Sequence, residues 1–256
     1  MIIRCVDSRN DGPWSGWHHH SNWESNNVSN ALMFYPCRRS QVYRFFTLAF
    51  AHRGYTHLFV NCLLCLWFGL ILEANQKGWK SSLRVAAIFF SGVIFGSLMF
   101  SLMEPEKSNQ GSSCGVYALI GGNIAYILLN VKKEMGSLHT VAKKFWNPFQ
   151  VPMRILILFV FLVFDASFAI TSDRDKVSHS GHFIGATSGF LVGMVVVEKS
   201  VKEKWERYVE KFLAVLIPVV FVSLVSTHLV LTYVPVNGDK YMFPNETHKA
   251  IGGKCE

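Results

Sequence analysis

The sequence has little charge for its length. Asp, Glu, Lys and Arg make up 16% of the 256 residues, against roughly 25% in soluble domains, while half of the residues are apolar. This composition disfavours a disordered chain, a coiled coil and a plain cytosolic enzyme. Six cysteines are too few for a disulfide-stapled secreted scaffold, and no Cys/His set has the spacing of a structural zinc site. We therefore expect neither a metal site nor an organic cofactor.

Long apolar runs are what the sequence has instead. Six stretches are apolar over the roughly 20 residues that a helix needs to cross a bilayer. Each must be helical, because backbone groups inside lipid have no water to bond to. The expected fold class is all-α, a polytopic transmembrane helix bundle with six predicted spans. They are Tyr55–Glu73, Val85–Met103, Ser113–Val131, Val151–Thr171, His179–Val197 and Phe212–Val234.

Basic residues alternate between the connecting segments. Three segments contain twelve Lys and Arg residues, and the three alternate segments contain six. By the positive-inside rule, the richer set faces the cytosol and the poorer set faces the lumen or the exterior. The net charge of +8 then reflects orientation in the membrane, and no nucleic-acid partner is expected. The richer set is 74–84, 132–150 and 198–211, and the poorer set is 104–112, 172–181 and 235–256.

The same pattern divides the chain and assigns it to a compartment. We expect an integral, multi-pass protein of the secretory pathway or plasma membrane. Two N-x-S/T sequons, at Asn27 and Asn245, lie in segments predicted to be outside and are candidate glycosylation sites. The predicted parts are an outer-side, partly disordered segment 1–43, a membrane core 44–199, a cytosolic linker 200–211, an additional transmembrane helix 212–234 and an outer-side tail 235–256.

The first predicted span contains a polar pair. His57 and Asn61 are four residues apart and therefore lie on one face of the helix. Ionisable groups inside a membrane cost about 2.5–3.5 kcal/mol each on insertion scales, so they indicate a function by default. Taken alone, a polar pair that joins neighbouring helices is an equally good interpretation.

A serine opens the third predicted span, in the run Gly111-Ser112-Ser113-Cys114-Gly115. Glycine-rich backbone beside Ser113 can point N–H groups at an oxyanion. The run also matches the G-x-S-x-G elbow of soluble hydrolases, but a membrane span follows here in place of the soluble helix that an elbow needs. Taken alone, a serine at a helix start is more often a cap than a nucleophile.

The fifth predicted span begins near the same outer face and contains His182. It has glycine at every fourth position from Gly181 to Gly193, a stripe that lets a neighbouring helix approach closely. Packing this stripe against one in the third span would bring His182 within hydrogen-bond reach of Ser113. The stripe in the third span is Gly115, Ala118, Gly122 and Ala125.

Such a pair is suited to general-base catalysis. His182 would take the Ser113 proton as the hydroxyl attacks a carbonyl, and would later protonate the leaving amine. No acidic residue is near either one in the sequence, so we expect a dyad. Tyr117 would stack on the imidazole in the orienting role that an aspartate has in triads. His57, Asn61 and the Ser113 N–H would form the oxyanion hole.

Together these motifs resemble the rhomboid intramembrane serine proteases, over about Pro36 to Lys199. The family has a His-x-x-x-Asn pair, a Gly-x-Ser with a tyrosine four residues after the serine, and a histidine that heads a glycine-striped span. The resemblance implies a bundle whose first core helix is missing from this chain and in which 212–234 is an extra helix, as in the secretase-type rhomboids of animal cells. The matching residues are His52, His57, Asn61, Gly111, Ser113, Tyr117, His182, Gly185 and Gly189.

The resemblance also implies an activity. It predicts a serine endopeptidase, surrounded by membrane lipid, that cleaves single-pass transmembrane proteins near the outer membrane face. Cys114 stands where the family has glycine, and Tyr43 stands where it has tryptophan. The alternative is a catalytically impaired or truncated rhomboid-like protein that binds membrane clients and affects their trafficking.

Overall fold

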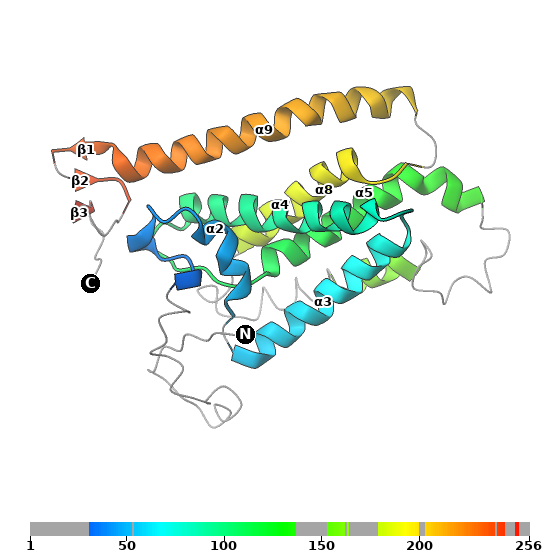
Figure 1. Ribbon diagram of the computed structural model, residues 1–256, viewed down its shortest axis with the longest axis horizontal. Coiled ribbons are helices and arrows are strands. Elements are labelled where there is room, and N and C mark those ends of the chain that lie inside the picture. The colour runs from blue at the N-terminus through cyan, green and yellow to red at the C-terminus, as the bar shows by residue number, and fades with distance from the viewer. Residues whose placement is uncertain are drawn as a thin grey trace.

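Five long helices form most of the part of the chain that the structure describes. The computed structural model describes residues 31–52, 54–136, 153–161, 163, 179–199, 203–238, 240–243 and 249–250. Figure 1 shows α4, α5 and α8 in the middle of the bundle, with α3 on one side and α9 on the other. The described part of the chain is thus mostly helical, in agreement with the all-α prediction. The bounds are α3 Gly54–Ala74, α4 Lys80–Met103, α5 Ser113–Gly136, α8 His179–Val196 and α9 Lys204–Tyr233.

Short elements gather at one end of the bundle, where α4 ends and α5 begins (Figure 1). We call this the outer end and the opposite one the inner end. Strand β1 pairs antiparallel with β2, and β2 pairs parallel with β3. The short elements are η3 Pro36–Arg38, α2 Arg44–Thr47, η4 Leu48–Phe50, β1 Pro235–Asn237, β2 Lys240–Tyr241 and β3 Lys249–Ala250.

Four of the described helices are long and apolar enough to cross a membrane, against six predicted spans. Helix α8 covers the predicted fifth span, but its histidines and glycines lower its mean hydropathy, and it is not one of the four. In the predicted fourth span, Val151–Thr171, residues 153–161 and 163 are helical and the others lie outside the described residues. The four helices are Tyr55–Ala74, Lys80–Met103, Ser113–Asn130 and Lys204–Tyr233.

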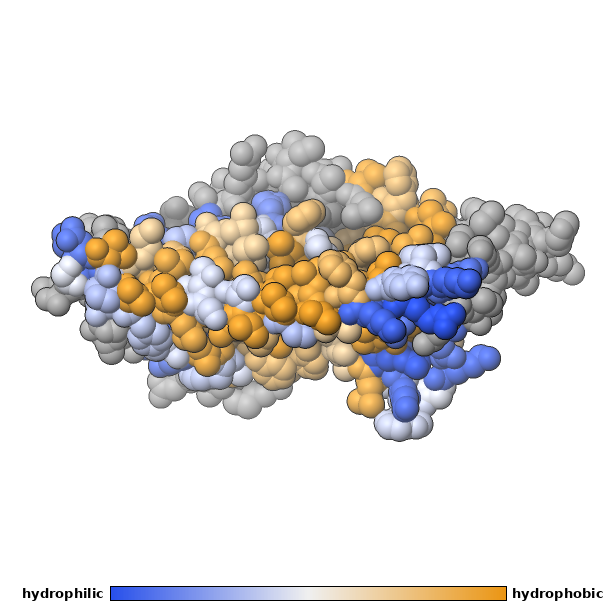
Figure 2. Space-filling model, turned by 90° about the horizontal axis from the view of Figure 1, so that it is seen from above, coloured by the Kyte–Doolittle hydropathy of each residue, from blue (hydrophilic) through white to orange (hydrophobic). Residues whose placement is uncertain are grey.

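Helix α9 begins at Lys204, before the start predicted at Phe212. A capping box explains the early start, because the side chains of Glu203 and Glu206 each accept from the backbone N–H of the other. Most of the predicted linker 200–211 is therefore the beginning of this helix. Its 30 residues extend about 45 Å, more than the roughly 30 Å of a hydrocarbon core. Figure 2 shows an apolar band along this side of the molecule, with a hydrophilic cluster at one end.

Helices α5 and α8 touch along their backbones. A Cβ placed on Gly185 would overlap the Cys114 carbonyl, and one placed on Gly189 would overlap the backbone of Ala118. Further along, a Cβ on Gly193 would lie 2.9 Å from that of Ala125. The close approach predicted from the two stripes is therefore present. It makes α5 the central helix, since 72% of its span is buried, against 11% for α9.

Three residues of the predicted α5 stripe also face α4. Ala118 Cβ lies against Gly92 of α4, and a Cβ on Gly122 would be 2.9 Å from Ile88 Cγ2. A Cβ on Gly115 would meet the Phe89 ring of α4, whereas Gly121, which the stripe did not include, lies against the backbone of Ala186 in α8. The predicted stripe therefore lies between α4 and α8, and the contact with α8 also includes Gly121, which the prediction left out. The reason is that α5 has close neighbours on two sides, and residues at the two edges of one stripe face different helices.

Residues 153–161 contact α5 through a buried arginine. Arg154 Nη2 donates to Asn123 Oδ1 at 2.5 Å, and its guanidinium lies 4.6 Å from the centre of the Tyr126 ring. Asn123 Nδ2 in turn donates to the carbonyls of Phe68 and Leu119, at 3.1 and 2.8 Å. This polar network joins α3, α5 and the helical segment 153–161 inside the bundle.

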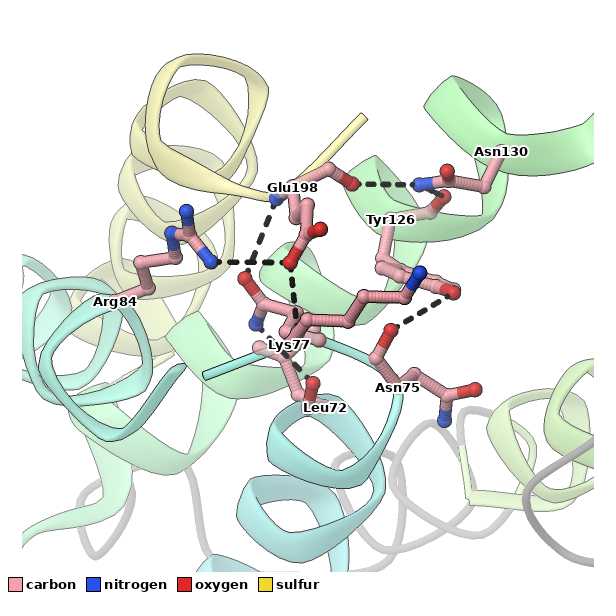
Figure 3. Close-up of polar contacts among 8 residues, drawn as sticks. Leu72, Asn75, Lys77, Arg84, Tyr126, Asn130 and Glu198 are labelled. Atoms are coloured by element: carbon pink, nitrogen blue, oxygen red, sulfur yellow. Dashed lines mark hydrogen bonds and ion pairs between the residues drawn. The ribbon is translucent and has the colours of Figure 1, made fainter. Parts of the chain in front are cut away.

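Contacts around Glu198, just after α8, close the inner end (Figure 3). Its carboxylate accepts from the Lys77 backbone N–H at 2.7 Å and from Arg84 at 3.3 Å. Its own N–H donates to the Gln76 side chain at 3.3 Å, and its carbonyl accepts from Asn130 at 3.1 Å. We call these five residues the inner clasp. They join the inner ends of α3, α4, α5 and α8.

Candidate active site

The turn before α5 presents Ser113 at the first position of the helix. The Ser112 carbonyl accepts from the N–H groups of Gly115 and Val116, at 2.9 and 3.1 Å, which closes the first turn. The Ser113 N–H is one of the amides at a helix start that have no intrahelical acceptor. Gly111 has φ +116°, a conformation that side chains rarely adopt, and its N–H donates to the Leu48 carbonyl at 3.0 Å.

The structure brings Ser113 and His182 together. His182 Nε2 lies 2.9 Å from Ser113 Oγ. The Tyr117 ring, one turn deeper in α5, stacks on the His182 imidazole with 4.2 Å between ring centres and 14° between ring planes. A neutral imidazole with its proton on Nδ1 can accept the hydroxyl proton at Nε2. The pair therefore has the geometry that a general base and its nucleophile need.

His52 contacts the same turn through Ser112. Its Nε2 lies 3.1 Å from Ser112 Oγ and 3.4 Å from the Ser112 N–H nitrogen. Burial, helped by the neighbouring His57, lowers the pKa of His52 to about 4. The ring is therefore neutral at physiological pH and can accept a hydrogen bond from Ser112.

His57 and Asn61 lie close to this turn on α3. A Cβ on Gly111 would be 2.8 Å from His57 Cε1, so the imidazole lies directly against the glycine. Asn61 is buried, and its Nδ2 donates to the His57 carbonyl at 2.8 Å. Among the residues that the structure describes, no hydrogen bond joins Asn61 to Ser113. His57 is thus beside the turn that leads into Ser113, while Asn61 bonds within its own helix.

The Cys114 side chain packs against α4, and its thiol also lies within hydrogen-bond reach of the Ser113 side chain. It is buried, and a Cβ on Gly96 of α4 would lie 2.9 Å from Cys114 Cβ and 3.0 Å from its Sγ. The missing side chain of Gly96 thus leaves the space that Cys114 fills. The first turn of α5 forms with cysteine at the position where glycine was expected.

Sequence reasoning missed a carboxylate near the site. Glu104, at the outer end of α4, accepts from Ser180 Oγ at 2.8 Å and pairs with Lys107 at 3.2 Å. Ser180 lies in the first turn of α8, two residues before His182, where a negative charge is favourable. No sequence pattern indicates this contact, because the two partners are 76 positions apart.

The other residues singled out in the sequence lie away from the dyad or cannot be placed. Tyr43 is half exposed and its hydroxyl donates to Gln41 at 3.0 Å. Asn27 and Asn245 lie outside the described residues. Within the described part of the chain, no group of three His, Cys, Asp or Glu side chains is placed to bind a metal ion.

Comparisons with known proteins agree with these motifs. A family model, that of the rhomboid domain, matches residues 39–199. The chain is 34% identical over 193 residues to rhomboid-related protein 1 of Caenorhabditis elegans, covering 71% of this chain and 48% of that protein. It is 29% identical over 175 residues to rhomboid-related protein 2 of Mus musculus, covering 66% and 53%. It is 27% identical over 165 residues to inactive rhomboid-related protein 2 of Caenorhabditis elegans, covering 62% and 42%.

The chain spans about half the length of these relatives. The rhomboid match, however, extends over more than half of the chain itself, and it includes Ser113, Tyr117 and His182. Several of the described helices in that region are long and apolar enough to span a bilayer. The protein is therefore a multi-pass integral membrane protein and belongs to the rhomboid family.

Proposed function

We propose that the protein is an intramembrane serine endopeptidase that cleaves single-pass transmembrane substrates near the outer membrane face. The observation that supports this most strongly is the 2.9 Å separation of Ser113 Oγ and His182 Nε2, from residues 69 positions apart. In this proposal the chain crosses the membrane six times, and the dyad faces the lumen or exterior of the secretory pathway or plasma membrane. Neither a metal ion nor an organic cofactor takes part.

The reaction follows from the dyad geometry. Ser113 Oγ attacks the peptide carbonyl carbon while His182 Nε2 takes the hydroxyl proton. The tetrahedral intermediate breaks its C–N bond as His182 returns that proton to the leaving amine, which leaves an acyl group on Ser113. Water then attacks the acyl carbon with His182 again as the base, and the carboxylic product leaves with Ser113 restored.

The oxyanion of the intermediate needs hydrogen-bond donors. The Ser113 N–H is available at the start of α5, where the helix dipole also favours negative charge. His57 lies against Gly111, and Asn61 has a second amide hydrogen beyond the one donated to His57. We assign these three groups to the oxyanion hole. Loss of one such donor costs about 10²–10³ in turnover.

The supporting residues fix the geometry of the dyad. Tyr117 keeps the His182 ring in one orientation by stacking on it. Gly185 and Gly189 let α8 approach α5 closely enough for the dyad to meet. Gly111 adopts the positive φ that the turn requires, and His52 accepts from Ser112 in the same turn.

The second candidate is a catalytically silent rhomboid-like protein that binds membrane clients and affects their trafficking. One relative is named as inactive, and Cys114 replaces the glycine expected after the nucleophile. Against this alternative, the Cys114 side chain fills the space beside Gly96, and the chain has both the serine and the histidine.

The test is cleavage of a single-pass reporter co-expressed with the full chain. Ser113→Ala and His182→Ala should each abolish the cleaved product while the amount of protein stays unchanged. The matched controls are Ser91→Ala, whose hydroxyl donates only within α4, and Thr187→Ala, which does the same within α8. Both controls should cleave as the wild type does. Unchanged cleavage by Ser113→Ala would refute the catalytic assignment.

A further inference from the structure

Helix α9 is joined to the outer end of the bundle by buried polar contacts. Most of α9 faces outward, yet His228 has an exposed fraction of only 1%. Its Nε2 lies 3.2 Å from the Arg39 carbonyl oxygen, and its Nδ1 lies 3.3 Å from Ser101 Oγ. A carbonyl oxygen can only accept, so Nε2 carries a proton and donates to Arg39. Ser101 Oγ also donates to the Leu98 carbonyl at 2.7 Å, so its contact with Nδ1 is the longer of the two.

Arg39 is the centre of these contacts. It is 1% exposed, and its guanidinium donates to the carbonyls of Ser101 and Pro105 at 2.9 and 2.6 Å. The Phe243 ring, beyond the end of α9, lies 4.2 Å from its Cζ atom. Burial lowers the pKa of Arg39 to about 10, so the group stays charged at neutral pH. One buried cation thus joins α4, the residues after α9 and the segment before α3.

That segment, residues 32–52, contacts the turn before Ser113 at three places. We call it the outer segment. Its contacts fall on residues 109, 111 and 112, which lead directly into the nucleophile. The contacts are the paired backbone bonds of Phe34 with Asn109 at 3.0 Å, the Gly111 N–H to the Leu48 carbonyl at 3.0 Å, and His52 with Ser112 at 3.1 Å.

Aromatic packing connects α9 to the same segment. The His228 ring meets Phe45 edge to face, with 4.8 Å between ring centres, and Phe45 stacks on Phe34 at 5.2 Å. Phe34 is also the residue that pairs with Asn109. A continuous path of contacts therefore runs from α9 through the outer segment to the turn before Ser113.

On the basis of the function proposed above, we propose that α9 positions the nucleophile, with His228 and Arg39 as positioning residues that fix the outer segment against the Ser113 turn. Within the part of the chain that the structure describes, neither residue is hydrogen-bonded to Ser113 or His182. A buried cation that loses an acceptor carries a large desolvation penalty, so the outer segment cannot shift without breaking these contacts. A displacement of about 1 Å at a reacting group can cost a factor of 10² in rate.

The test compares three variants of the full chain in lipid nanodiscs. His228→Phe keeps an aromatic ring beside Phe45 but cannot donate to Arg39. His228→Gln retains an N–H group where Nε2 lies. Leu229→Phe, at a partly exposed neighbouring position, is the matched control. The first readout is backbone hydrogen exchange of residues 104–112, which does not depend on activity. The second is the rate of covalent labelling by a fluorophosphonate probe, together with kcat and KM for a transmembrane reporter.

We expect His228→Phe to speed exchange at Asn109 and Gly111, and to slow labelling about tenfold with kcat reduced and KM unchanged. His228→Gln should restore both readouts, and Leu229→Phe should match the wild type. Should His228→Phe fail to fold, Ser101→Ala removes one contact of His228 and should show the same changes, but smaller.

Exchange at residues 104–112 that is unchanged in both His228→Phe and Ser101→Ala would overturn the positioning role. So would His228→Gln behaving like His228→Phe, because loss of the imidazole shape, rather than of the hydrogen bond to Arg39, would then explain both. Absence of labelling in the wild type would instead count against the proposed protease function. The exchange measurements would still decide whether α9 fixes the turn.

Discussion

The two ends of the bundle are joined by polar contacts of different kinds. In the inner clasp the amide side chains of Gln76 and Asn130 are buried, but the two charged side chains that pair there, Glu198 and Arg84, are 34% and 25% exposed. At the outer end, Arg39 and His52 are 1% and 3% exposed. A partly exposed ion pair contributes about 0–1 kcal/mol, whereas a buried polar group left without its partner costs about 1–3 kcal/mol.

The more deeply buried polar contacts are at the end of the bundle where the proposed reaction takes place. Ser113 and His182 lie at the outer end, where a small displacement would separate the proposed nucleophile from its proposed base. The inner end only has to keep four helices together, and helix packing along α5 and α8 already contributes to that. Variants at the two ends, and in the glycine stripe between them, should therefore have effects of different size.

The largest effect is expected between the two ends, in the glycine stripe. Gly189→Ala places a methyl group against the backbone of Ala118, which must force α5 and α8 apart. Overpacking of this kind costs about 1–3 kcal/mol, and it should also separate Ser113 from His182 and abolish fluorophosphonate labelling. Thermal unfolding in detergent and labelling measure the two effects.

The control for that variant is Gly69→Ala in α3. The nearest atoms to a Cβ there are 3.7 and 3.8 Å away, which is ordinary contact distance. It should unfold and label as the wild type does. Normal labelling of Gly189→Ala would contradict the close approach of α5 and α8.

The outer end should also respond to pH through His52. Its pKa of about 4 in the folded protein lies below the ordinary value of 6.5, so the unfolded chain binds more protons between these values. The stabilisation from neutral His52 is complete above about pH 6.5 and is lost as the pH falls toward about 4. Thermal midpoints at pH 7.5 and 4.5 measure this loss.

His52→Gln provides the comparison, because glutamine can accept from Ser112 but does not titrate. The decrease in thermal midpoint between pH 7.5 and 4.5 should be smaller in this variant than in the wild type. Equal decreases would show that His52 is not the titrating group.

A smaller effect is expected from the ring that stacks on the base. Tyr117→Leu removes the aromatic face from the His182 imidazole and should slow labelling about tenfold, the equivalent of about 1.4 kcal/mol. Tyr117→Phe keeps the stacking face and should label nearly as fast as the wild type. If Tyr117→Phe were as slow as Tyr117→Leu, the hydroxyl rather than the ring would be the important group.

The smallest effect is expected at the inner clasp. Glu198→Gln removes the ion pair with Arg84 but leaves an oxygen that can accept from the Lys77 N–H. The thermal midpoint should fall only slightly, by the equivalent of less than about 1 kcal/mol, and the labelling rate should not change. A labelling rate as slow as that of His228→Phe would remove the distinction between the two ends.

Much of the site could be predicted because residues three or four positions apart in a helix lie on the same face. Ser113 and Tyr117, like His57 and Asn61, are one turn apart, and such spacings place residues on one face whatever surrounds them. The glycine stripe in α8 indicated a close helix neighbour, which is the contact that places His182 beside Ser113. Membership of the rhomboid family, inferred from the same residues, is confirmed.

Contacts between single residues far apart in the chain could not be predicted. Glu104 and Ser180 are 76 positions apart, and His228 and Arg39 are 189 positions apart, with no repeated pattern at either place. A single histidine in an apolar helix has the same sequence signature whether it faces lipid or a buried carbonyl. The neighbours of Gly115 depended on the positions of α4 and α8 around α5, which one sequence does not specify.

The most direct test of the proposed catalytic pair is to find which residue a covalent probe labels. The full chain in lipid nanodiscs would be treated with a fluorophosphonate and the modified peptide identified by mass spectrometry. The proposed dyad mechanism predicts one labelled residue, Ser113, and no label in His182→Ala. A label on Ser112, or an unlabelled wild-type chain, would contradict it.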